Sequence, residues 1–194
     1  MLVTYRLARR GLRKESVLEA VRAVLVTLHE RRRGFRVIDF SIQDDHLHFV
    51  VEADDARSFK SGYYALSIRL GKRINAALGS SGRIFADRRH YRLLTSPREV
   101  RNARAYVLLN RNHHAAKRGR GADDHVDPFS SAEWFDGWKE ERRFVRLGPC
   151  PVAVPETWLA RVGWRRYGLI SLREIPGSPR RGSEAGAPAR GRDA

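Results

Sequence analysis

Residues 35–53 have the sequence FRVIDFSIQDDHLHFVVEA, and this stretch decides the fold. Residues 35–43 and 46–53 are rich in Val, Ile and Phe, which favour β-strands. The pair Asp44-Asp45 separates them, as expected for the turn of a hairpin. The stretch therefore predicts two antiparallel strands that meet at two acidic residues.

Side chains alternate between the two faces of the second strand. His46 and His48 project to one face, whereas Leu47, Phe49 and Val51 project to the other. The apolar face suits contact with a layer of helices. The two imidazoles, held side by side on a rigid strand, are typical of half of a divalent metal site. Histidines that share a face without binding metal are also common.

The elements on either side of the hairpin complete a βαββαβ order. Residues 2–8 and 83–94 favour strands, while apolar residues recur at helical spacing in residues 16–33 and 57–78. Ser96-Pro97-Arg98-Glu99 is typical of a capped helix start, and this last helix is expected to end near residue 115. The order predicts an α+β fold. It is a ferredoxin-like antiparallel sheet with two helices on one face and an extra helix on the other.

The composition divides the chain into three parts. Residues 1–116 form the predicted domain, and residues 117–175 form an extension that holds all four tryptophans and is expected to pack on the domain. We expect Trp134, Phe135 and Trp138 to dock this extension, and we assign it no fold. Residues 176–194 are dominated by Pro, Gly, Ala and Arg, which predicts a disordered tail.

The charge of the chain points to a polyanionic partner. The 194 residues include 38 Lys and Arg against 22 Asp and Glu, so the formal net charge is +16. Nucleic acid is the first candidate, and a merely solubilising surface rarely needs such an excess. No apolar run approaches the ~18 residues of a membrane span, and no leader is visible, so a cytoplasmic, nucleoid-associated protein without a membrane partner is expected. The single cysteine, Cys150, excludes an internal disulfide and a cysteine-based zinc site.

A tyrosine and an asparagine on the last helix form a second candidate half-site. Tyr106 and Asn110 are four residues apart, which stacks them on one helix face. His113 falls near the same stripe, and Glu52 on the hairpin shares the face of the histidines as a further ligand or hydrogen-bond acceptor. Alternatively, Tyr106 is a core aromatic with its hydroxyl at the rim, and Glu52 is solvated.

Basic residues near these elements are candidates for phosphate contacts. Part of the set is on the helix at 57–78 and the rest is on the strand at 83–94. The predicted DNA-binding residues are Lys60, Arg69, Lys72, Arg73, Arg83, Arg88, Arg89 and Arg92.

The two half-sites together resemble a known family. His46-Leu47-His48 matches a His-hydrophobe-His motif in a central strand, and Tyr106-Val-Leu-Leu-Asn110 matches a Tyr-x-x-x-Asn helix. Over residues 2–116 the chain resembles the HUH-type single-tyrosine transposases of the IS200-like class, and within it the REP-associated tyrosine transposases. Members usually carry Pro after the Asn, where this chain has Arg111.

The resemblance implies a metal-dependent enzyme that cleaves and rejoins single-stranded DNA. Tyr106 would be the nucleophile of a 5′-phosphotyrosine intermediate, while His46, His48 and Asn110 would hold Mg²⁺ or Mn²⁺. The implied partner is single-stranded or hairpin DNA, with both a monomer and a dimer open. Two alternatives remain: a catalytically silent nucleic-acid-binding protein of the same fold, and a metal-dependent RNA-processing enzyme.

Overall fold

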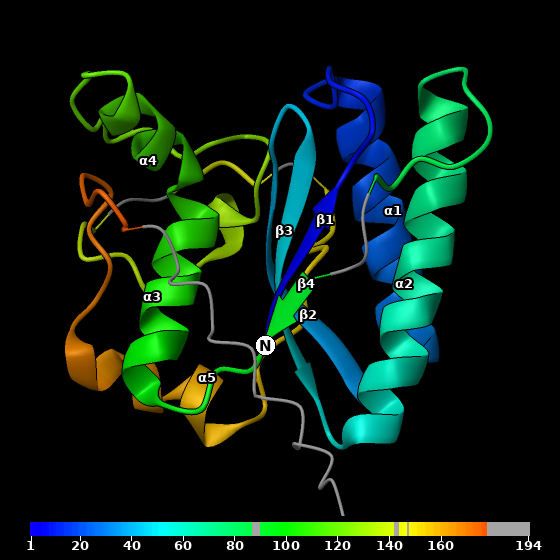
Figure 1. The fold of residues 1–194 in the computed structure, drawn as a ribbon. Coiled ribbons are helices and arrows are strands. Elements are labelled where there is room, and N and C mark those ends of the chain that lie inside the picture. Colours follow the sequence, from blue (N-terminus) through cyan, green and yellow to red (C-terminus); the bar gives the residue numbers. More distant parts are fainter. Residues whose placement is uncertain (87–89, 142–143, 147, 178–194) are drawn as a thin grey trace, which may run out of the picture.

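The computed structural model describes residues 1–86, 90–141, 144–146 and 148–177. Four strands and two long helices come first, and shorter helices follow (Figure 1). In chain order the elements are β1 (Leu2–Arg6), α1 (Glu15–Arg31), β2 (Phe35–Ile42), β3 (His46–Ala53), α2 (Ala56–Ala77), β4 (His90–Arg92), α3 (Pro97–Leu108), α4 (Asn110–Lys117), η1 (Ala132–Trp134), α5 (Trp158–Arg161) and η2 (Gly163–Tyr167).

The four strands form one antiparallel sheet in the order β2-β3-β1-β4. With α1 after β1 and α2 after β3, this is the βαββαβ arrangement of a ferredoxin-like fold, and that prediction is confirmed. The sheet separates α1 and α2 on one face from α3 on the other (Figure 1). The histidine strand β3 lies in the interior of the sheet, between β1 and β2.

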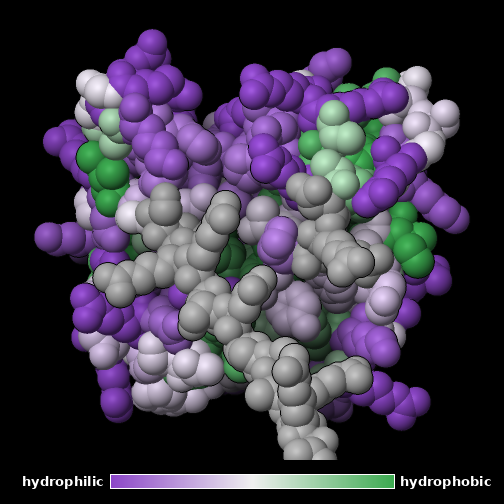
Figure 2. Space-filling view, viewed as in Figure 1, coloured by the Kyte–Doolittle hydropathy of each residue, from purple (hydrophilic) through white to green (hydrophobic). Residues whose placement is uncertain are grey.

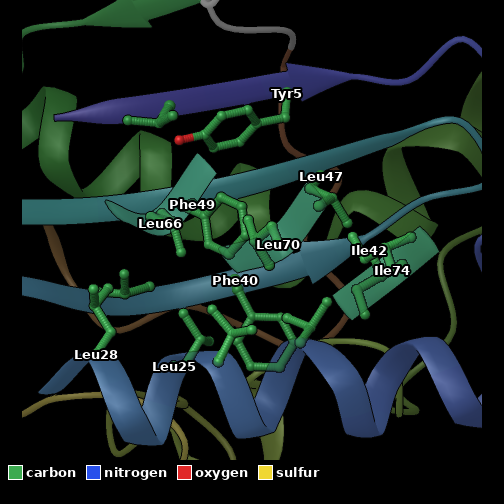
Figure 3. Packing of buried hydrophobic residues seen from close by; sticks show 14 of the residues in the cluster. Tyr5, Leu25, Leu28, Phe40, Ile42, Leu47, Phe49, Leu66, Leu70 and Ile74 are labelled. Carbon is green, nitrogen blue, oxygen red and sulfur yellow. The ribbon is translucent and has the colours of Figure 1, made fainter. Parts of the chain in front are cut away.

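A first apolar core fills the space between the sheet and α1 and α2. Figure 3 shows Phe40 and Ile42 of β2 and Leu47 and Phe49 of β3 pointing toward the helical side chains. Helix α2 approaches the sheet closely at Gly62, where a Cβ atom would lie 2.1 Å from the ring of Phe35. The apolar stripes read from the sequence therefore lie in this core.

A β-bulge at Ile38 reverses the alternation along β2. Val37 pairs with Val51 and Asp39 pairs with Val50, so one residue of β2 is left over. Before the bulge, odd-numbered side chains face α1 and α2, and after it even-numbered ones do. Asp39 thereby turns toward the layer of α3.

A second core lies on the opposite face of the sheet. It joins Ile38 and Val50 of the sheet to the buried face of α3 and to Trp138 and Trp164 of the C-terminal part. The predicted position of the extra helix across the sheet from α1 and α2 is therefore confirmed. The division of the chain into a domain and an extension stays a prediction, and residues 178–194 of the expected tail lie outside the described residues.

A buried ion pair fastens α3 to the sheet. Nε of Arg104 donates to Oδ2 of Asp39 at 2.8 Å, and a second guanidinium nitrogen donates to Oδ1 at 3.2 Å. The two residues are 4% and 2% exposed. Burial raises the pKa of the Asp39 carboxyl, and the guanidinium of Arg104 opposes that rise. The same guanidinium lies 4.6 Å above the ring of Phe135 and donates to the carbonyl of Ala160, so one side chain joins three parts of the chain.

Two elements differ from their expected extents. The fourth strand is only His90–Arg92, preceded by an isolated bridge from Leu7 to Phe85. The predicted single helix to about residue 115 is wrong, because it breaks at Leu109, with φ −110° and ψ 27°. Residues 107–110 are all buried, which a straight amphipathic helix with one apolar stripe does not achieve. None of the helices in the described residues is long and apolar enough to cross a membrane.

A half-buried histidine, His29 of α1, should make the stability of this fold sensitive to acid. Nε2 of His29 accepts a hydrogen bond from the backbone N–H of Val37 at 3.2 Å, and burial lowers the pKa of His29 to about 4. As the pH falls, His29 therefore binds a proton near pH 6.5 in the unfolded state but only near pH 4 in the folded state. We expect the stability to fall by up to about 3 kcal/mol between pH 6.5 and 4 from this residue. His29→Gln keeps an acceptor that does not titrate, so denaturant titrations should show a shallower loss over this range. Identical pH profiles for both proteins would contradict this role.

The buried ion pair gives a prediction about stability. Arg104→Met leaves the Asp39 carboxylate buried without its partner and should cost about 3–5 kcal/mol of unfolding free energy. The double variant Asp39→Leu/Arg104→Met removes both charges and should recover most of the loss in urea denaturation. A double variant as unstable as the single one would show that the packing of Arg104, and not its charge, fastens α3.

Candidate functional site

The two histidines of β3 lie side by side on the face that looks toward α3. Their ring centroids are 4.6 Å apart. His48 is opposite Thr4 of β1 and Ser41 of β2, so it lies in the middle of the sheet. The neighbouring Leu47 and Phe49 belong to the core on the other face. Alternation along a central strand thus places both imidazoles on a rigid support.

Each imidazole has one nitrogen already engaged. The hydroxyl of Thr4 lies 3.0 Å from Nδ1 of His48, and a carboxylate oxygen of Asp45 lies 2.6 Å from Nδ1 of His46. Nε2 of His48 is buried and has no hydrogen-bond partner. Burial, assisted by three neighbouring histidine side chains, lowers the pKa of His48 to about 3. At neutral pH the imidazole is therefore uncharged, and in the tautomer in which Nδ1 donates to the Thr4 hydroxyl its Nε2 has a free lone pair, which is the state that binds a metal.

The capped start of α3 places Tyr106 over these histidines. The side chain of Ser96 accepts from the N–H of Glu99, and Glu99 accepts from the N–H of Ser96, so the predicted capping box is confirmed. The ring of Tyr106 lies 5.1 Å from that of His48 and 5.3 Å from that of His113. Burial raises the pKa of the Tyr106 phenol. The tyrosine is half-buried beside the two histidines and packs against the second core, so its position fits both a reactive tyrosine and the alternative of a core aromatic with its hydroxyl at the rim.

Asn110 reaches the site from a separate helix. It is the first residue of α4, directly after the break at Leu109, and is 1% exposed. Both polar atoms of its amide are buried without a hydrogen-bond partner. The amide lies close enough to Tyr106 to oppose the rise in the pKa of the phenol, although no hydrogen bond of ordinary geometry joins them. Two unpartnered buried atoms are costly and call for a ligand.

The donors at this site fit a divalent cation. Two imidazoles and an amide oxygen suit Mn²⁺ and are compatible with Mg²⁺, and two of the donor groups are otherwise left unsatisfied. Within the described residues no three His, Cys, Asp or Glu side chains group as metal ligands. The unpartnered amide of Asn110 fits the role of a third ligand, and both this role and the metal itself stay predictions.

Glu52 does not join the site, and both interpretations of it are wrong. It is 5% exposed and accepts from Arg36 at 3.3 Å and from the N–H groups of Glu156 and Thr157 at 2.8 and 3.1 Å. These bonds fasten the C-terminal part to the end of β3. The signal for this role was absent from the sequence, because the partners in the C-terminal part are more than a hundred residues away.

The structure describes six of the eight predicted DNA-binding residues. Lys60, Arg69, Lys72 and Arg73 are on α2, across the sheet from Tyr106 (Figure 1). Arg92 pairs with Leu2 at the sheet edge, whereas Arg83 donates to the carbonyls of Phe85 and Ala86 in its own loop. Arg88 and Arg89 lie outside the described residues. Contact with DNA stays a prediction for each of them.

A basic groove that the sequence did not indicate opens beside His46. It has a volume of about 490 Å³. Arg13 in its wall pairs with Asp127 at 2.7 Å, and Arg111 pairs with Asp123 at 3.0 Å. Its cationic and imidazole lining comprises Arg10, Arg13, Arg111, Arg118, His46 and His114. The helical spacing that led from Tyr106 to His113 could also have included His114. The approach of residues 10–13 to this groove depends on tertiary structure, which helical spacing does not show.

No family model matches the chain, and no curated protein matches it. One solved structure is similar, described as the structure of a REP-associated tyrosine transposase bound to a REP hairpin. The identity is 18% and the TM-score is 0.48, over 67% of this chain and 74% of that one. This likeness carries no conclusion about what the present chain does.

The unsatisfied donors predict a metal-dependent gain in stability. We expect Mn²⁺ to raise the melting temperature of the wild-type protein, because a ligand at 100 times its Kd adds about 2.7 kcal/mol. Asn110→Leu should be at least as stable in EDTA, since it removes a buried unpartnered amide, but should gain less from Mn²⁺. His125→Ala, which removes an exposed histidine, serves as the control and should keep the full gain. Equal gains in all three proteins would exclude Asn110 as a ligand.

Proposed function

We propose that this protein is a metal-dependent transesterase of single-stranded DNA, a transposase or nickase, that acts through Tyr106. The observation that carries the proposal is the convergence of three elements on one point. β3 supplies His48 with a free Nε2, α3 supplies a phenol ring 5.1 Å away, and α4 supplies the unpartnered amide of Asn110. The motif resemblance over residues 2–116 supports the same chemistry.

The proposed reaction exchanges one phosphoester bond for another. The phenolic oxygen of Tyr106 attacks phosphorus and gives up its proton, the bond to the 3′-oxygen breaks, and that oxygen leaves as a hydroxyl. The 5′-phosphotyrosine that forms keeps the energy of the ester, so the reverse step rejoins DNA without ATP. Mg²⁺ or Mn²⁺ held by His46, His48 and Asn110 would neutralise charge on a non-bridging phosphate oxygen.

Burial gives Tyr106 a defined resting state. A phenol is neutral at pH 7 and burial raises the pKa of Tyr106 further, so the residue would rest protonated and give up its proton during the attack. The helix that carries it is fastened by Arg104, which is two residues away, so the phenol is held in position before substrate binds. A positioned nucleophile beside charge-neutralising groups is the general requirement for phosphoryl transfer.

The runner-up function is nucleic-acid binding without turnover. The specific observation in its favour is that four predicted DNA-binding residues are on α2, on the opposite face of the sheet from Tyr106. Binding there would need no chemistry at the histidines. The experiment that separates the two functions is the search for a covalent product.

Tyr106→Phe should abolish a covalent protein–DNA adduct and leave DNA binding intact, because only the phenolic oxygen is removed. The measurement is a denaturing gel of protein incubated with labelled single-stranded oligonucleotides and Mn²⁺. Tyr91→Phe, which removes the hydroxyl of an exposed tyrosine on β4, is the matched control and should form the adduct normally. An adduct that persists in Tyr106→Phe would assign the nucleophile to another residue.

A fully duplex oligonucleotide of the same sequence should not be cleaved. A tyrosine on a rigid helix must meet one phosphate in line, and a strand held in register by its complement resists that placement. We therefore expect cleavage of one strand only, in single-stranded substrates. Equal cutting of both strands of a blunt duplex would favour an ordinary metal nuclease.

A further inference from the structure

A second groove lies between α1 and α2, on the side of the sheet away from Tyr106. Its volume is about 720 Å³. The floor is apolar, with Ala23 and Val24 from α1 and Ala65 and Ile68 from α2. The rim is basic and consists of Arg31, Arg32, Arg69, Lys72 and Arg73. A neighbouring hollow shares Arg32 and Ile68 with it and extends the surface to Arg57, Lys60 and Tyr64. We call this whole surface the α1–α2 groove.

The positive charge of the α1–α2 groove is not compensated locally. Among the described residues, no carboxylate lines either hollow. Nor does any Asp or Glu in the described parts of the chain lie within ion-pair distance of its seven cations. The groove beside His46 differs, because two of its four arginines are paired with Asp127 and Asp123. A polyanion is therefore attracted more strongly to the side of the sheet away from Tyr106.

The apolar residues of the α1–α2 groove favour unpaired bases over a duplex. Tyr64 is 47% exposed and Ile68 is 57% exposed, and they are one helical turn apart on the outer face of α2. Figure 2 shows hydrophobic and hydrophilic side chains interleaved along the right-hand margin, where α2 lies. Single strands bind where aromatic side chains stack on bases and cations follow the backbone, whereas a duplex hides its base faces.

We propose that the α1–α2 groove binds a segment of single-stranded nucleic acid. Phosphates would lie against Arg69, Lys72 and Arg73, and a base would stack on Tyr64. The link between this groove and cleavage rests on the proposed function. If Tyr106 attacks one phosphate of the substrate, the groove holds another part of the same substrate, remote from that phosphate. Nucleic acid would thus contact the helical layer of α1 and α2 on one side of the protein, where it is retained, and the site of Tyr106 on the other, where it is cleaved.

The test is equilibrium binding of a labelled oligothymidylate to the full chain in EDTA, over a range of salt concentrations. The variant Arg69→Ala/Lys72→Ala/Arg73→Ala removes three cations from one helix face and keeps good helix formers there. Each lost phosphate contact should reduce the slope of log K against log salt by about 0.7, so the variant should lose about 2 from that slope. The matched control, Arg98→Ala/Arg120→Ala/Arg161→Ala, removes three exposed cations elsewhere and should retain the wild-type slope.

A second variant tests the stacking. Tyr64→Ala should weaken oligothymidylate binding roughly tenfold at every salt concentration, with the slope unchanged, because no charge is lost. A duplex of equal length and a polyglutamate chain serve as competitors and should displace the oligonucleotide poorly. Unchanged binding in both variants, an equal loss in the control, or equal competition by polyglutamate would overturn the proposal.

A separate measurement, formation of the covalent adduct, tests the proposed function. Binding in EDTA involves no cleavage, so a wild-type protein that forms no adduct would refute the transesterase and leave the groove result standing. If both hold, the triple variant should still form the adduct at saturating oligonucleotide, with the loss confined to the concentration required. A triple variant that binds normally but forms no adduct would contradict retention as the role of the groove.

Discussion

The contact between Arg104 and Asp39 is the interaction on which the rest of the site depends. It places a guanidinium and a carboxylate in the interface between sheet and helix, where water does not compensate either charge. The pair has one acceptable geometry, so it fixes the position of α3 along the sheet as well as its distance from it. Because Tyr106 is two residues further on, the register of this ion pair determines where the phenol meets the histidines of β3.

The C-terminal part completes this arrangement. The rings of Phe135 and Trp164 cover the guanidinium of Arg104, while Glu52 accepts hydrogen bonds from residues 156 and 157 at the far end of β3. Asn112 of α4 donates to the carbonyl of Leu172 at 2.7 Å, and Nδ1 of His113 donates to that of Pro176 at 2.8 Å. Residues beyond the ferredoxin-like sheet thus hold both α3 and α4, the two helices that carry Tyr106 and Asn110.

The strands, the two long helices and the shared face of His46 and His48 could be predicted because each depends on local periodicity. The capping box of α3 is likewise local. The partners of Asp39 and Glu52 could not be predicted, because they depend on residues 65 and more than 100 positions away. The break at Leu109 was missed because a count of four from Tyr106 to Asn110 assumes a continuous helix. The basic residues are distributed over both sides of the sheet because of the topology of the fold. A list of the basic residues in the sequence carries no information about that topology.

The bulge at Ile38 has a consequence for how this gene can vary. Before Ile38 the odd-numbered side chains of β2 face the core with α1 and α2, and after it the even-numbered side chains do. Loss of the codon for Ile38 would restore regular alternation and leave Phe35, Val37, Phe40 and Ile42 facing the same core, whereas loss of the codon for Arg36 or Ser41 would turn the side chains on one side of the deletion to the other face. The irregularity at Ile38 is thus a point at which β2 can lose a residue over evolution and keep its apolar side chains in the core, whereas the regular parts of the strand cannot.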